Sequence, residues 1–490
     1  MKRSNMLFSV RMVTLAFLFA VLSSFSFTVS ATEQDDRDSV LQIHVTTGEE
    51  EGNIPLSGII LDLYKTDLAI IPPDGNVPEA DLARYRSRSN LAVTLMTDKL
   101  GNAEVKQGLS DGIYLVTEQP NPAMAGELTP FYIALDGTSQ CLYLQKIPEK
   151  SPQLVMDIQT IQQKSGTFDM DQSHTWIIRS QIPAGIATAE EFTVVDTLDP
   201  RLFHIRDGIR ICLWSVSDST IMLDEGIHYA VTTQTFQSTG GPTESVTVSL
   251  LPEGLTYAGE FLKEKGNGEL RIFLQTAISS SAPLGIAIPN DAHLTYRNSA
   301  GVIYQADSDI PEVHTGGIHI RKIKENGQPL PGAEYMIARE ATQAEMEQES
   351  VTKEILQVGK DTLAVVYMDF YQNDLQGDKS FTAVTGADGI ACIYGLAYGN
   401  YFLVESKPAD ERSAGSQPVR VRIDAESHLT ETDKLVDSTG RIVDNTIELS
   451  TIRYRFPNTG GLGTVGIKAA GVLLICAAGI LLLDNRRRRI

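Results

Sequence analysis

Residues 395–405 read Gly-Leu-Ala-Tyr-Gly-Asn-Tyr-Phe-Leu-Val-Glu, and residues 108–118 read Gly-Leu-Ser-Asp-Gly-Ile-Tyr-Leu-Val-Thr-Glu. Both stretches carry Gly, Leu, Gly, Tyr and Glu at the same spacing, so they are copies of one repeated unit. In each copy a glycine turn precedes a run of aromatic and branched residues, which is the pattern of a β-strand. The openings of the copies also match, because Pro-Leu-x-Gly occurs at 55–58 and again at 329–332. The sequence therefore predicts two related β domains.

The rest of the chain carries the same kind of signal. Short alternating runs at residues 41–45, 192–195, 246–250 and 419–423 lie between Gly, Pro, Asn and Asp punctuation. Such spacing favours β-sandwiches. The clearest helical pattern covers residues 341–357, which are rich in Glu, Gln and Ala, and it predicts an insertion in the third domain. We therefore predict an all-β fold of tandem immunoglobulin-like β-sandwich domains, with a different unit between the two copies.

The N-terminal residues have the composition of a secretory signal. Three basic residues accompany a mostly apolar stretch at 12–27, which is short for a membrane span. Small residues then lead to Ala31, and a polar sequence follows. We expect residues 1–31 to be a signal peptide that is cleaved after Ala31. The alternative is an uncleaved anchor helix.

The C-terminal residues form three parts in a fixed order. The pentapeptide Phe456-Pro457-Asn458-Thr459-Gly460 comes first, an apolar run at 469–483 follows, and four arginines at 486–489 come last. A plain single-span anchor would explain the apolar run and the arginines, which stay in the cytoplasm by the positive-inside rule. It would not explain the Pro-x-Thr-Gly motif. This arrangement resembles the LPxTG cell-wall sorting signal, with Phe456 in place of Leu, and the resemblance implies that a sortase cysteine attacks the Thr459 carbonyl.

Composition narrows the functional classes. The 62 acidic residues outnumber the 41 basic residues, which argues against nucleic-acid binding and suits an extracellular surface. The four cysteines are too few and too scattered for a disulfide framework. The sequence has no nucleophile elbow, no metal-binding histidine spacing and no phosphate loop. We therefore predict that the protein is not an enzyme and needs no cofactor or metal.

Taken together, these residues resemble a sortase-assembled pilin of Gram-positive bacteria. The strongest points of resemblance are the repeated Gly-Leu-x-x-Gly-x-Tyr-x-x-x-Glu unit and the pairing of Val-Asp196-Thr-Leu with Tyr-Arg-Asn298. The resemblance implies SpaA-like, CnaB-type outer domains and a fimbrial isopeptide-formation middle domain. The predicted segments are a signal peptide at 1–31, an N-terminal domain at 32–150, a middle domain at 151–313, a C-terminal domain at 314–455 and a sorting signal at 456–490.

Domains of this family often contain a bond between a lysine amine and an asparagine side chain, formed beside a carboxylate. The chemistry needs a neutral, buried lysine and a nearby acid that can shuttle a proton. In the third domain the resemblance implies Lys322 as the lysine and Glu405 as the carboxylate. Asn445 is the candidate amide, although Ser450 stands near the expected place.

The other two domains match this pattern less completely. In the middle domain Asp196 and Asn298 correspond to the acid and the amide, but the lysine partner is unclear. Met156 occupies the first-strand stretch where the lysine is expected, and Lys164 lies beyond it. The first domain keeps the glutamate of the repeat but has Val45 near the lysine position, so it is interpreted as a domain without the crosslink.

Polymerisation in this family also requires a lysine that accepts the next subunit. The stretch before the first predicted boundary contains Lys146 and Lys150, and both are candidates. The leading hypothesis is a pilus subunit that sortase polymerises or anchors to the wall through Thr459. The alternative is a monomeric wall-anchored adhesin that binds host protein or glycan. The expected partners are sortase, neighbouring pilin subunits and peptidoglycan, without nucleic acid, and the expected location is the cell surface, with a membrane-spanning segment in the precursor alone.

Overall fold

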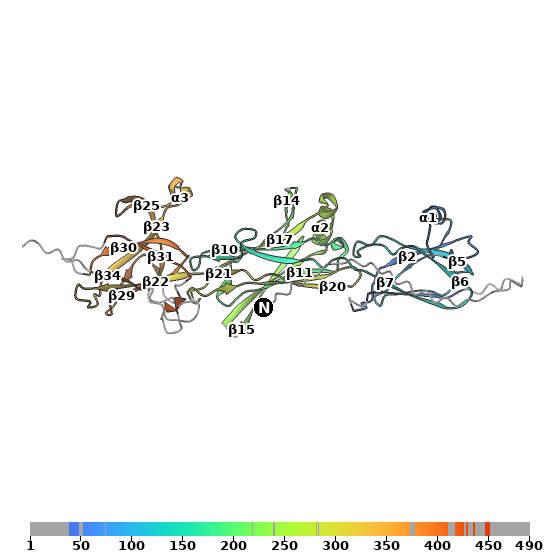
Figure 1. Cartoon of the computed structure of the whole chain (residues 1–490), viewed down its shortest axis with the longest axis horizontal. Coiled ribbons are helices and arrows are strands. Elements are labelled where there is room, and N and C mark those ends of the chain that lie inside the picture. The colour runs from blue at the N-terminus through green and yellow to red at the C-terminus, as the bar shows by residue number, and fades with distance from the viewer. Residues whose placement is uncertain are drawn as a thin grey trace, which may run out of the picture.

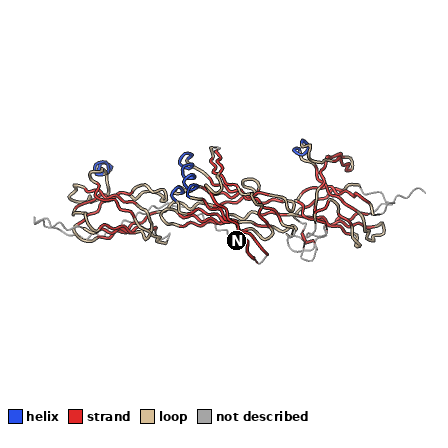
Figure 2. The backbone as a smooth tube through the Cα atoms, turned by 180° about the vertical axis from the view of Figure 1, so that it is seen from behind, coloured by secondary structure: helices blue, strands red, loops and turns tan. Residues whose placement is uncertain are grey.

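The computed structural model describes residues 39–450, with gaps at 49–51, 74, 218, 239–240, 281, 283, 373–377, 410–416, 426–427, 430–434 and 437–445. The strands form three units that follow one another along an elongated molecule (Figure 1). Figure 2 shows the few helices on the flank of each unit, away from the paired strands. This architecture confirms the predicted all-β class with tandem domains. The predicted signal peptide and sorting signal lie outside the described residues.

The first unit is a sandwich of two sheets with the strand orders β4-β1-β7 and β3-β2-β5-β6. Buried and more exposed residues alternate along β1, as expected for a strand with one face on a core. The first and last strands, β1 and β7, are parallel neighbours in register from Leu41 opposite Gln140 to Thr47 opposite Lys146. The elements are β1 (Leu41–Thr47), β2 (Ile60–Lys65), α1 (Glu79–Tyr85), β3 (Leu91–Met96), β4 (Asn102–Val105), β5 (Gly112–Glu118), β6 (Phe131–Leu135) and β7 (Gln140–Lys146).

The middle unit is larger and packs two main sheets around its core. Their orders are β14-β13-β17-β10-β8 and β15-β16-β11-β19-β20, and a small sheet β18-β21-β9 lies beside them. Helix α2 begins with Pro252 and ends at Lys265, and the next residue, Gly266, caps it with a positive φ. The strands are β8 (Leu154–Ile158), β9 (Ser165–Thr167), β10 (His174–Gln181), β11 (Glu191–Thr197), β12 (Leu202–His204), β13 (Arg210–Ser215), β14 (Ser219–Met222), β15 (Tyr229–Ser238), β16 (Gly241–Leu250), β17 (Glu269–Ile278), β18 (Ile288–Pro289), β19 (Ala292–Arg297), β20 (Ile303–Asp307) and β21 (Glu312–His314); the helices are η2 (Ile186–Thr188) and α2 (Pro252–Lys265).

The third unit repeats the sandwich of the first. Its sheets have the orders β27-β26-β29-β22-β34 and β24-β25-β23-β30-β31, and its first and last strands, β22 and β34, are again parallel neighbours. The elements are β22 (Gly316–Ile323), β23 (Glu334–Glu340), α3 (Gln343–Glu347), β24 (Glu354–Val358), β25 (Asp361–Tyr367), β26 (Phe370–Gln372), β27 (Lys379–Ser380), β28 (Ala383–Val384), β29 (Ile390–Leu396), β30 (Gly399–Lys407), β31 (Val419–Ile423), β32 (His428–Leu429), β33 (Leu435–Val436) and β34 (Thr446–Ser450).

The predicted helix at 341–357 is only partly correct. A capping box between Thr342 and Glu345 starts α3, but the helix ends at Glu347. Residues 354–358 instead form β24, which pairs with β25 along its whole length. Sheet pairing therefore overrides the local helical composition in the second half of this segment.

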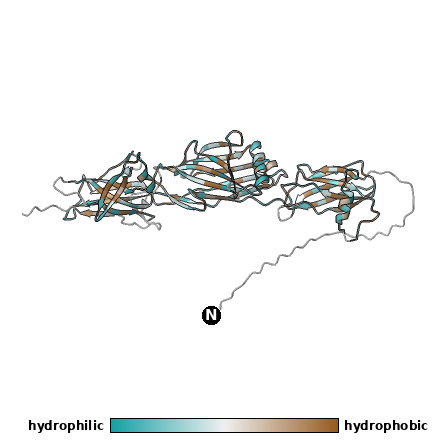
Figure 3. Ribbon diagram, turned by 90° about the horizontal axis from the view of Figure 1, so that it is seen from above, coloured by the Kyte–Doolittle hydropathy of each residue, from teal (hydrophilic) through white to brown (hydrophobic). Residues whose placement is uncertain are grey.

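Each unit has its own hydrophobic core between its sheets. Figure 3 shows hydrophobic residues alternating with hydrophilic ones along the strands of all three units. The largest fully buried side chains include Trp176, Tyr114, Tyr296 and Tyr335, and a charged residue, Lys322, is among them. A lysine in a core requires a compensating partner, because burying an unpaired charge is costly.

Candidate functional site

The third unit buries an ion pair between Lys322 on β22 and Glu405 on β30. The Lys322 Nζ lies 3.0 Å from both carboxylate oxygens, and the two side chains are 2% and 1% exposed. The strands belong to different sheets, so the pair bridges the sandwich through its core. The Tyr335 ring lies beside the amine, with its centroid 5.9 Å from Nζ. The structure thus brings together the predicted lysine and the predicted carboxylate.

The position opposite Lys322 on the last strand holds no amide. In the parallel register of β22 and β34, Lys322 faces Leu449, and Ser450 faces Ile323. Leu449 packs against the hydrophobic core of the unit. Asn445, the predicted amide, lies outside the described residues, and the next residue, Thr446, is opposite His319. The described strand therefore places a leucine where a lysine–asparagine bond would need its amide.

The first unit contains a second buried pair that the sequence interpretation missed. Lys146 on β7 lies 2.6 Å from the Glu118 Oε2, and the side chains are 2% and 0% exposed. The Lys146 amine also donates to the carbonyl of Gly126 at 2.7 Å, and the Leu128 N–H donates to the same Glu118 oxygen. Val45 fills the first-strand position, as predicted, and is fully buried. The lysine therefore comes from the last strand of this unit and not from the first.

This geometry corrects the role assigned to Lys146. A residue that accepts another subunit must be reachable, whereas Lys146 is enclosed and paired. Its orientation could have been inferred from Leu142-x-Leu144-x-Lys146, since alternate residues of a strand share one face. Lys150, the other predicted candidate, is exposed.

In the middle unit Asp196 on β11 is paired with a different asparagine from the predicted one. The Asn290 side-chain amide donates to Asp196 Oδ2 at 2.9 Å, and both residues are buried. Asp196 lines a small apolar cavity with residues that include Ile178 and Ile272. Burial raises the pKa of Asp196 to about 8, and the Asn290 hydrogen bond opposes this rise.

Asn298 lies too far along the sheet to pair with Asp196. Asp196 is opposite Ala292 on β19, and Asn298 follows Ala292 by six residues, a distance of about 20 Å along a strand. Asn298 instead stabilises a turn by accepting the N–H groups of Ala300 and Val302 at 3.1 and 3.0 Å. Its predicted pairing with Asp196 is therefore wrong.

The residue at the expected lysine position and the lysine beyond it both have other roles. Met156 on β8 is fully buried in the core. Lys164 lies at the unit's surface, where its amine donates to Asp157 Oδ1 at 2.6 Å and to the Met156 carbonyl at 2.5 Å. Within the ranges that the structure describes, no lysine forms an ion pair with Asp196. Among the described residues, the acid Asp196 and the amide of Asn290 thus lie together without a neighbouring lysine.

The junction between the first and middle units centres on the buried Glu149. The Glu149 carboxylate accepts the Gly185 N–H at 2.9 Å and the Tyr296 hydroxyl at 2.6 Å, while its backbone carbonyl accepts the Tyr304 hydroxyl at 2.8 Å. Burial and the neighbouring carboxylate raise the pKa of Tyr296. Glu149 follows the last strand of the first unit, and its three partners belong to the middle unit, so this residue fixes one unit on the other.

A loop of the middle unit completes this junction from the other side. Ala300 and Val302 lie in the hydrophobic core of the first unit. The Ala300 carbonyl accepts the Ser57 N–H at 3.0 Å, and Asn298 donates to the Ala123 carbonyl at 3.1 Å. The two units therefore share a continuous apolar and hydrogen-bonded contact.

The junction between the middle and third units is closed in a similar way. The Met170 N–H donates to the Gly395 carbonyl at 2.9 Å, and the Met170 carbonyl accepts from Lys379 at 2.7 Å. Asp169 accepts the Ala397 N–H at 2.7 Å. Burial raises the pKa of Asp169, while the Ala397 N–H acts in the opposite direction. Gly395 has a φ of +79°, which favours glycine, and a Cβ at this position would come within 2.9 Å of the Met170 sulfur.

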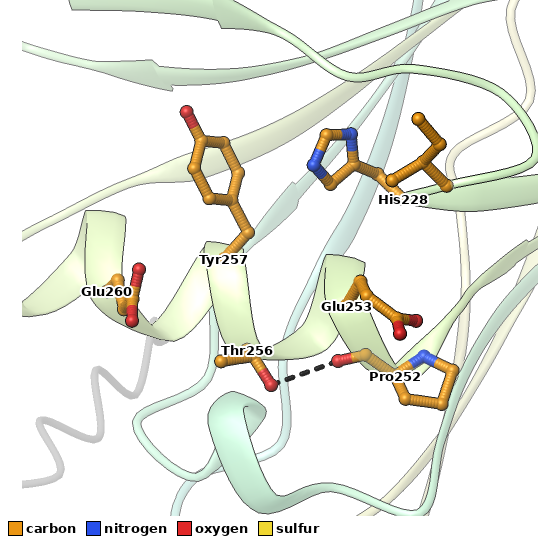
Figure 4. A pocket seen from close by; sticks show the side chains of 7 residues that line it. His228, Pro252, Glu253, Thr256, Tyr257 and Glu260 are labelled. Atoms are coloured by element: carbon orange, nitrogen blue, oxygen red, sulfur yellow. Dashed lines mark hydrogen bonds between the residues drawn. The ribbon is translucent and has the colours of Figure 1, made fainter.

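A shallow groove lies on the flank of the middle unit beside α2 (Figure 4). The rings of Tyr257 and His228 lie side by side, with centroids 5.0 Å apart, and two carboxylates flank them. The lining residues are Ile227, His228, Pro252, Glu253, Thr256, Tyr257 and Glu260. Across the described part of the chain, no cluster of three or more His, Cys, Asp or Glu residues is arranged to hold a metal ion. Nor is any described helix both long and apolar enough to span a bilayer.

The molecule is thus a tandem all-β protein whose outer units contain core lysine–glutamate pairs and whose units are joined by buried contacts. Residues 316–437, which make up most of the third unit, match the family of the SpaA prealbumin-like fold domain. The third unit is therefore a SpaA-type domain. Comparison with curated protein sequences found no match.

Several solved structures match this chain at low sequence identity. A 35 kDa C-terminal fragment of the major pilin GBS80 of Streptococcus agalactiae is 20% identical, with a TM-score of 0.44, over 62% of this chain and 100% of the fragment. The full-length RrgB pilus protein from Streptococcus pneumoniae is 12% identical, with a TM-score of 0.46, over 87% of this chain and 100% of that protein. The fimbrial protein FimP from Actinomyces oris is 16% identical, with a TM-score of 0.44, over 86% and 99% of the two chains.

Proposed function

We propose that this protein is a structural subunit of a pilus on the surface of a Gram-positive cell. The observation that carries the proposal is the end-to-end arrangement of three β units with buried junctions. Glu149 ties the first unit to the middle one, and the contacts of Met170 tie the middle unit to the third. Force along a fibre crosses the junction of the middle and third units, where an open linker would extend first.

The covalent step is assigned to the C-terminal pentapeptide. Sortase cleaves the bond between Thr459 and Gly460, and the Thr459 carbonyl then passes to an amine of the next subunit or of peptidoglycan. We assign the accepting amine on this subunit to Lys150. The side chain of Lys150 is exposed, and its neighbour Glu149 is locked into the junction. The amine is thus presented at a fixed place on the rod.

The buried lysines are assigned to stability and not to polymerisation. Lys146 and Lys322 each face a core carboxylate and are closed to solvent. In the third unit, Lys322 and Glu405 are the amine and the carboxylate that a lysine–asparagine bond requires. The residue opposite Lys322 is Leu449, which has no amide. We therefore propose that Lys322 and Glu405 remain an ion pair in the native chain.

Immunoblotting of wall extracts tests the assignment of Thr459 and Lys150. The native chain is expected to give a ladder of covalent multimers, and Thr459→Ala is expected to abolish it. Lys150→Arg is expected to remove the ladder while leaving wall-linked monomer. Lys106→Arg is the matched control, because Lys106 is exposed on the same unit. A ladder that survives Lys150→Arg would place the accepting amine elsewhere.

The groove beside α2 supports a second candidate function, the binding of a host ligand. Paired aromatic rings and flanking carboxylates suit a sugar, whose apolar face packs on a ring while its hydroxyls bond to the acids. A single wall-linked band in place of a ladder would favour this adhesin role. Glycan-array binding that is lost in Tyr257→Ala would then identify the site.

A further inference from the structure

Strand β15 is a long, open edge on the flank of the middle unit. It is the last strand of the sheet β15-β16-β11-β19-β20, so one row of its backbone N–H and C=O groups faces outward. Its pairing with β16 runs without a register shift from Tyr229 opposite Leu250 to Ser238 opposite Gly241. Residues 232–238 are all exposed. Both Figure 1 and Figure 2 show this hairpin projecting sideways from the long axis of the molecule.

The hairpin extends past the rest of its sheet. Pairing between β16 and β11 ends at Ser245, whereas pairing between β16 and β15 continues to Gly241. The tip of β15 is therefore supported on one side by β16 and is open on its other edge and on both faces. A strand in this position is accessible to another extended chain.

The sequence of β15 lacks the features that normally keep an edge unpaired. Proteins protect edges with charged residues, proline or bulges. Residues 229–238 read Tyr-Ala-Val-Thr-Thr-Gln-Thr-Phe-Gln-Ser, with no charge and no proline. Some other described edges carry charges: β31 has Arg420 and Arg422, and β24 begins with Glu354. The edge strands β3, β6 and β14 are also uncharged, but they have 6, 5 and 4 residues against the 10 of β15, and short edges are less open to pairing.

The absence of charged residues in β15 favours a second copy of the same chain as its partner. Two chains with a net charge of −21 repel each other wherever their charged surfaces meet, but β15 adds nothing to this repulsion. An antiparallel pair whose two-fold axis lies at the middle of β15 places either Thr233 or Gln234 opposite its own copy. Cross-strand threonine pairs and amide ladders are favourable, whereas charged residues would face like charges.

We infer that β15 pairs with β15 of a second copy of this chain and joins two molecules side by side. The two five-stranded sheets would then form one continuous sheet across the two-fold axis. This contact lies on the flank, far from both ends of the molecule, so it is compatible with end-to-end polymerisation. The inference goes beyond the proposed function, because lateral pairing needs neither sortase nor Lys150.

Cysteine crosslinking on cells that display the full chain tests this pairing. The background carries Cys141→Ser, which removes an exposed thiol, and Thr459→Ala, which prevents sortase-made bonds from contributing. Single cysteines are then placed at each position from 232 to 235 and oxidised. The Cα atoms of facing residues in antiparallel strands are about 4.5–5.5 Å apart, which suits a disulfide. We expect a disulfide-linked band at twice the chain mass, strongest at one position.

The control and a charge variant separate the outcomes. Gln305→Cys on β20, the opposite edge of the same sheet, is exposed and is expected to stay monomeric. Adding Gln234→Lys to Thr233→Cys, or Thr233→Lys to Gln234→Cys, is expected to weaken the dimer, since the two ammonium groups would then lie on one face of the joined sheet, two residues apart along it. Monomer at all four positions, or a disulfide to a protein of another mass, would overturn the inference.

Discussion

The buried pair of Lys322 and Glu405 makes a strong prediction about the stability of the third unit. Glu405→Gln keeps the shape of the side chain but removes its charge, which leaves Lys322 in the core without its counter-ion. Both oxygens of Glu405 lie 3.0 Å from the amine, and neither side chain is more than 2% exposed. Removing one partner of a pair buried in this way costs about 3–5 kcal/mol.

Native-state hydrogen exchange measures this cost inside the intact chain. A loss of 3–5 kcal/mol corresponds to roughly a hundredfold to several thousandfold faster exchange, since each tenfold change is about 1.4 kcal/mol. The affected peptides are those of β22 and β30, while peptides of the first unit should keep their rates. Intact mass first establishes that the native chain carries no amide crosslink, so that both proteins start from the same covalent structure.

A matched control uses the surface pair of Lys407 and Glu334. Its atoms are also 3.0 Å apart, but the side chains are 66% and 31% exposed. Lys407→Met should therefore cost at most about 1 kcal/mol. The double variant Lys322→Met with Glu405→Leu should regain most of the stability, because an apolar pair replaces two charges. A cost for Glu405→Gln no larger than that of Lys407→Met would refute the reasoning.

Three further predictions concern the other sites. Leu449→Asn places an amide opposite the buried lysine, so the amine should attack its carbonyl and release ammonia, lowering the intact mass by about 17 Da; adding Glu405→Gln should restore the full mass, and an unchanged mass for Leu449→Asn alone would contradict the register argument. The pKa of Asp196 is about 8 in the folded protein, against an ordinary value of 3.8. Between these pH values the folded state holds a proton that the unfolded chain has lost. The unfolding free energy of the middle unit should therefore fall by about 1.4 kcal/mol for each pH unit of increase across this range. Asp196→Asn should flatten this slope in denaturation series from pH 4 to 8, and an equal slope in both proteins would rule out Asp196 as its source. Tyr296→Phe removes a 2.6 Å hydrogen bond to Glu149 and should loosen the first junction by about 1.5–3 kcal/mol, seen as a wider distribution of end-to-end distances in small-angle scattering; an unchanged distribution would show that the apolar contacts suffice.

The fold class and one buried pair could be predicted from the sequence because they depend on local patterns. Strand alternation and the repeated Gly-Leu-x-x-Gly-x-Tyr-x-x-x-Glu unit depend on neighbouring residues alone. The repeat placed Glu118 and Glu405 in the same frame, and the structure gives both of them a buried lysine. The two lysines do not occupy equivalent positions in the repeat, since Lys322 lies on a first strand and Lys146 on a last strand.

The errors arose where the answer depends on which strands are neighbours. Asp196 and Asn298 are conspicuous in sequence, but the register of β11 and β19 places them at opposite ends of the pair. Asn290, the true partner, precedes β19 and has no distinguishing pattern. The role of Glu149 could not be inferred from the sequence, because its partners Gly185 and Tyr296 are distant along the chain. Long-range contacts of this kind leave no local periodicity to detect.

Under the proposed pilus function, the buried pair of the third unit lies in the path of tension along the rod. In both outer units the first and last strands are parallel neighbours, paired over β1 with β7 and over β22 with β34. With Lys150 as the accepting residue, tension enters the rod after the first unit and passes through the third unit from β22 to β34, so it shears their shared hydrogen bonds together and does not open them one by one. Lys322 ties the first of these strands to a glutamate of the opposite sheet. In the first unit, which lies outside this path, Lys146 on the last strand ties its strand to the matching glutamate of the repeat. A cation from either the first or the last strand can therefore pair with the glutamate, which keeps its place in the repeat while the lysine does not.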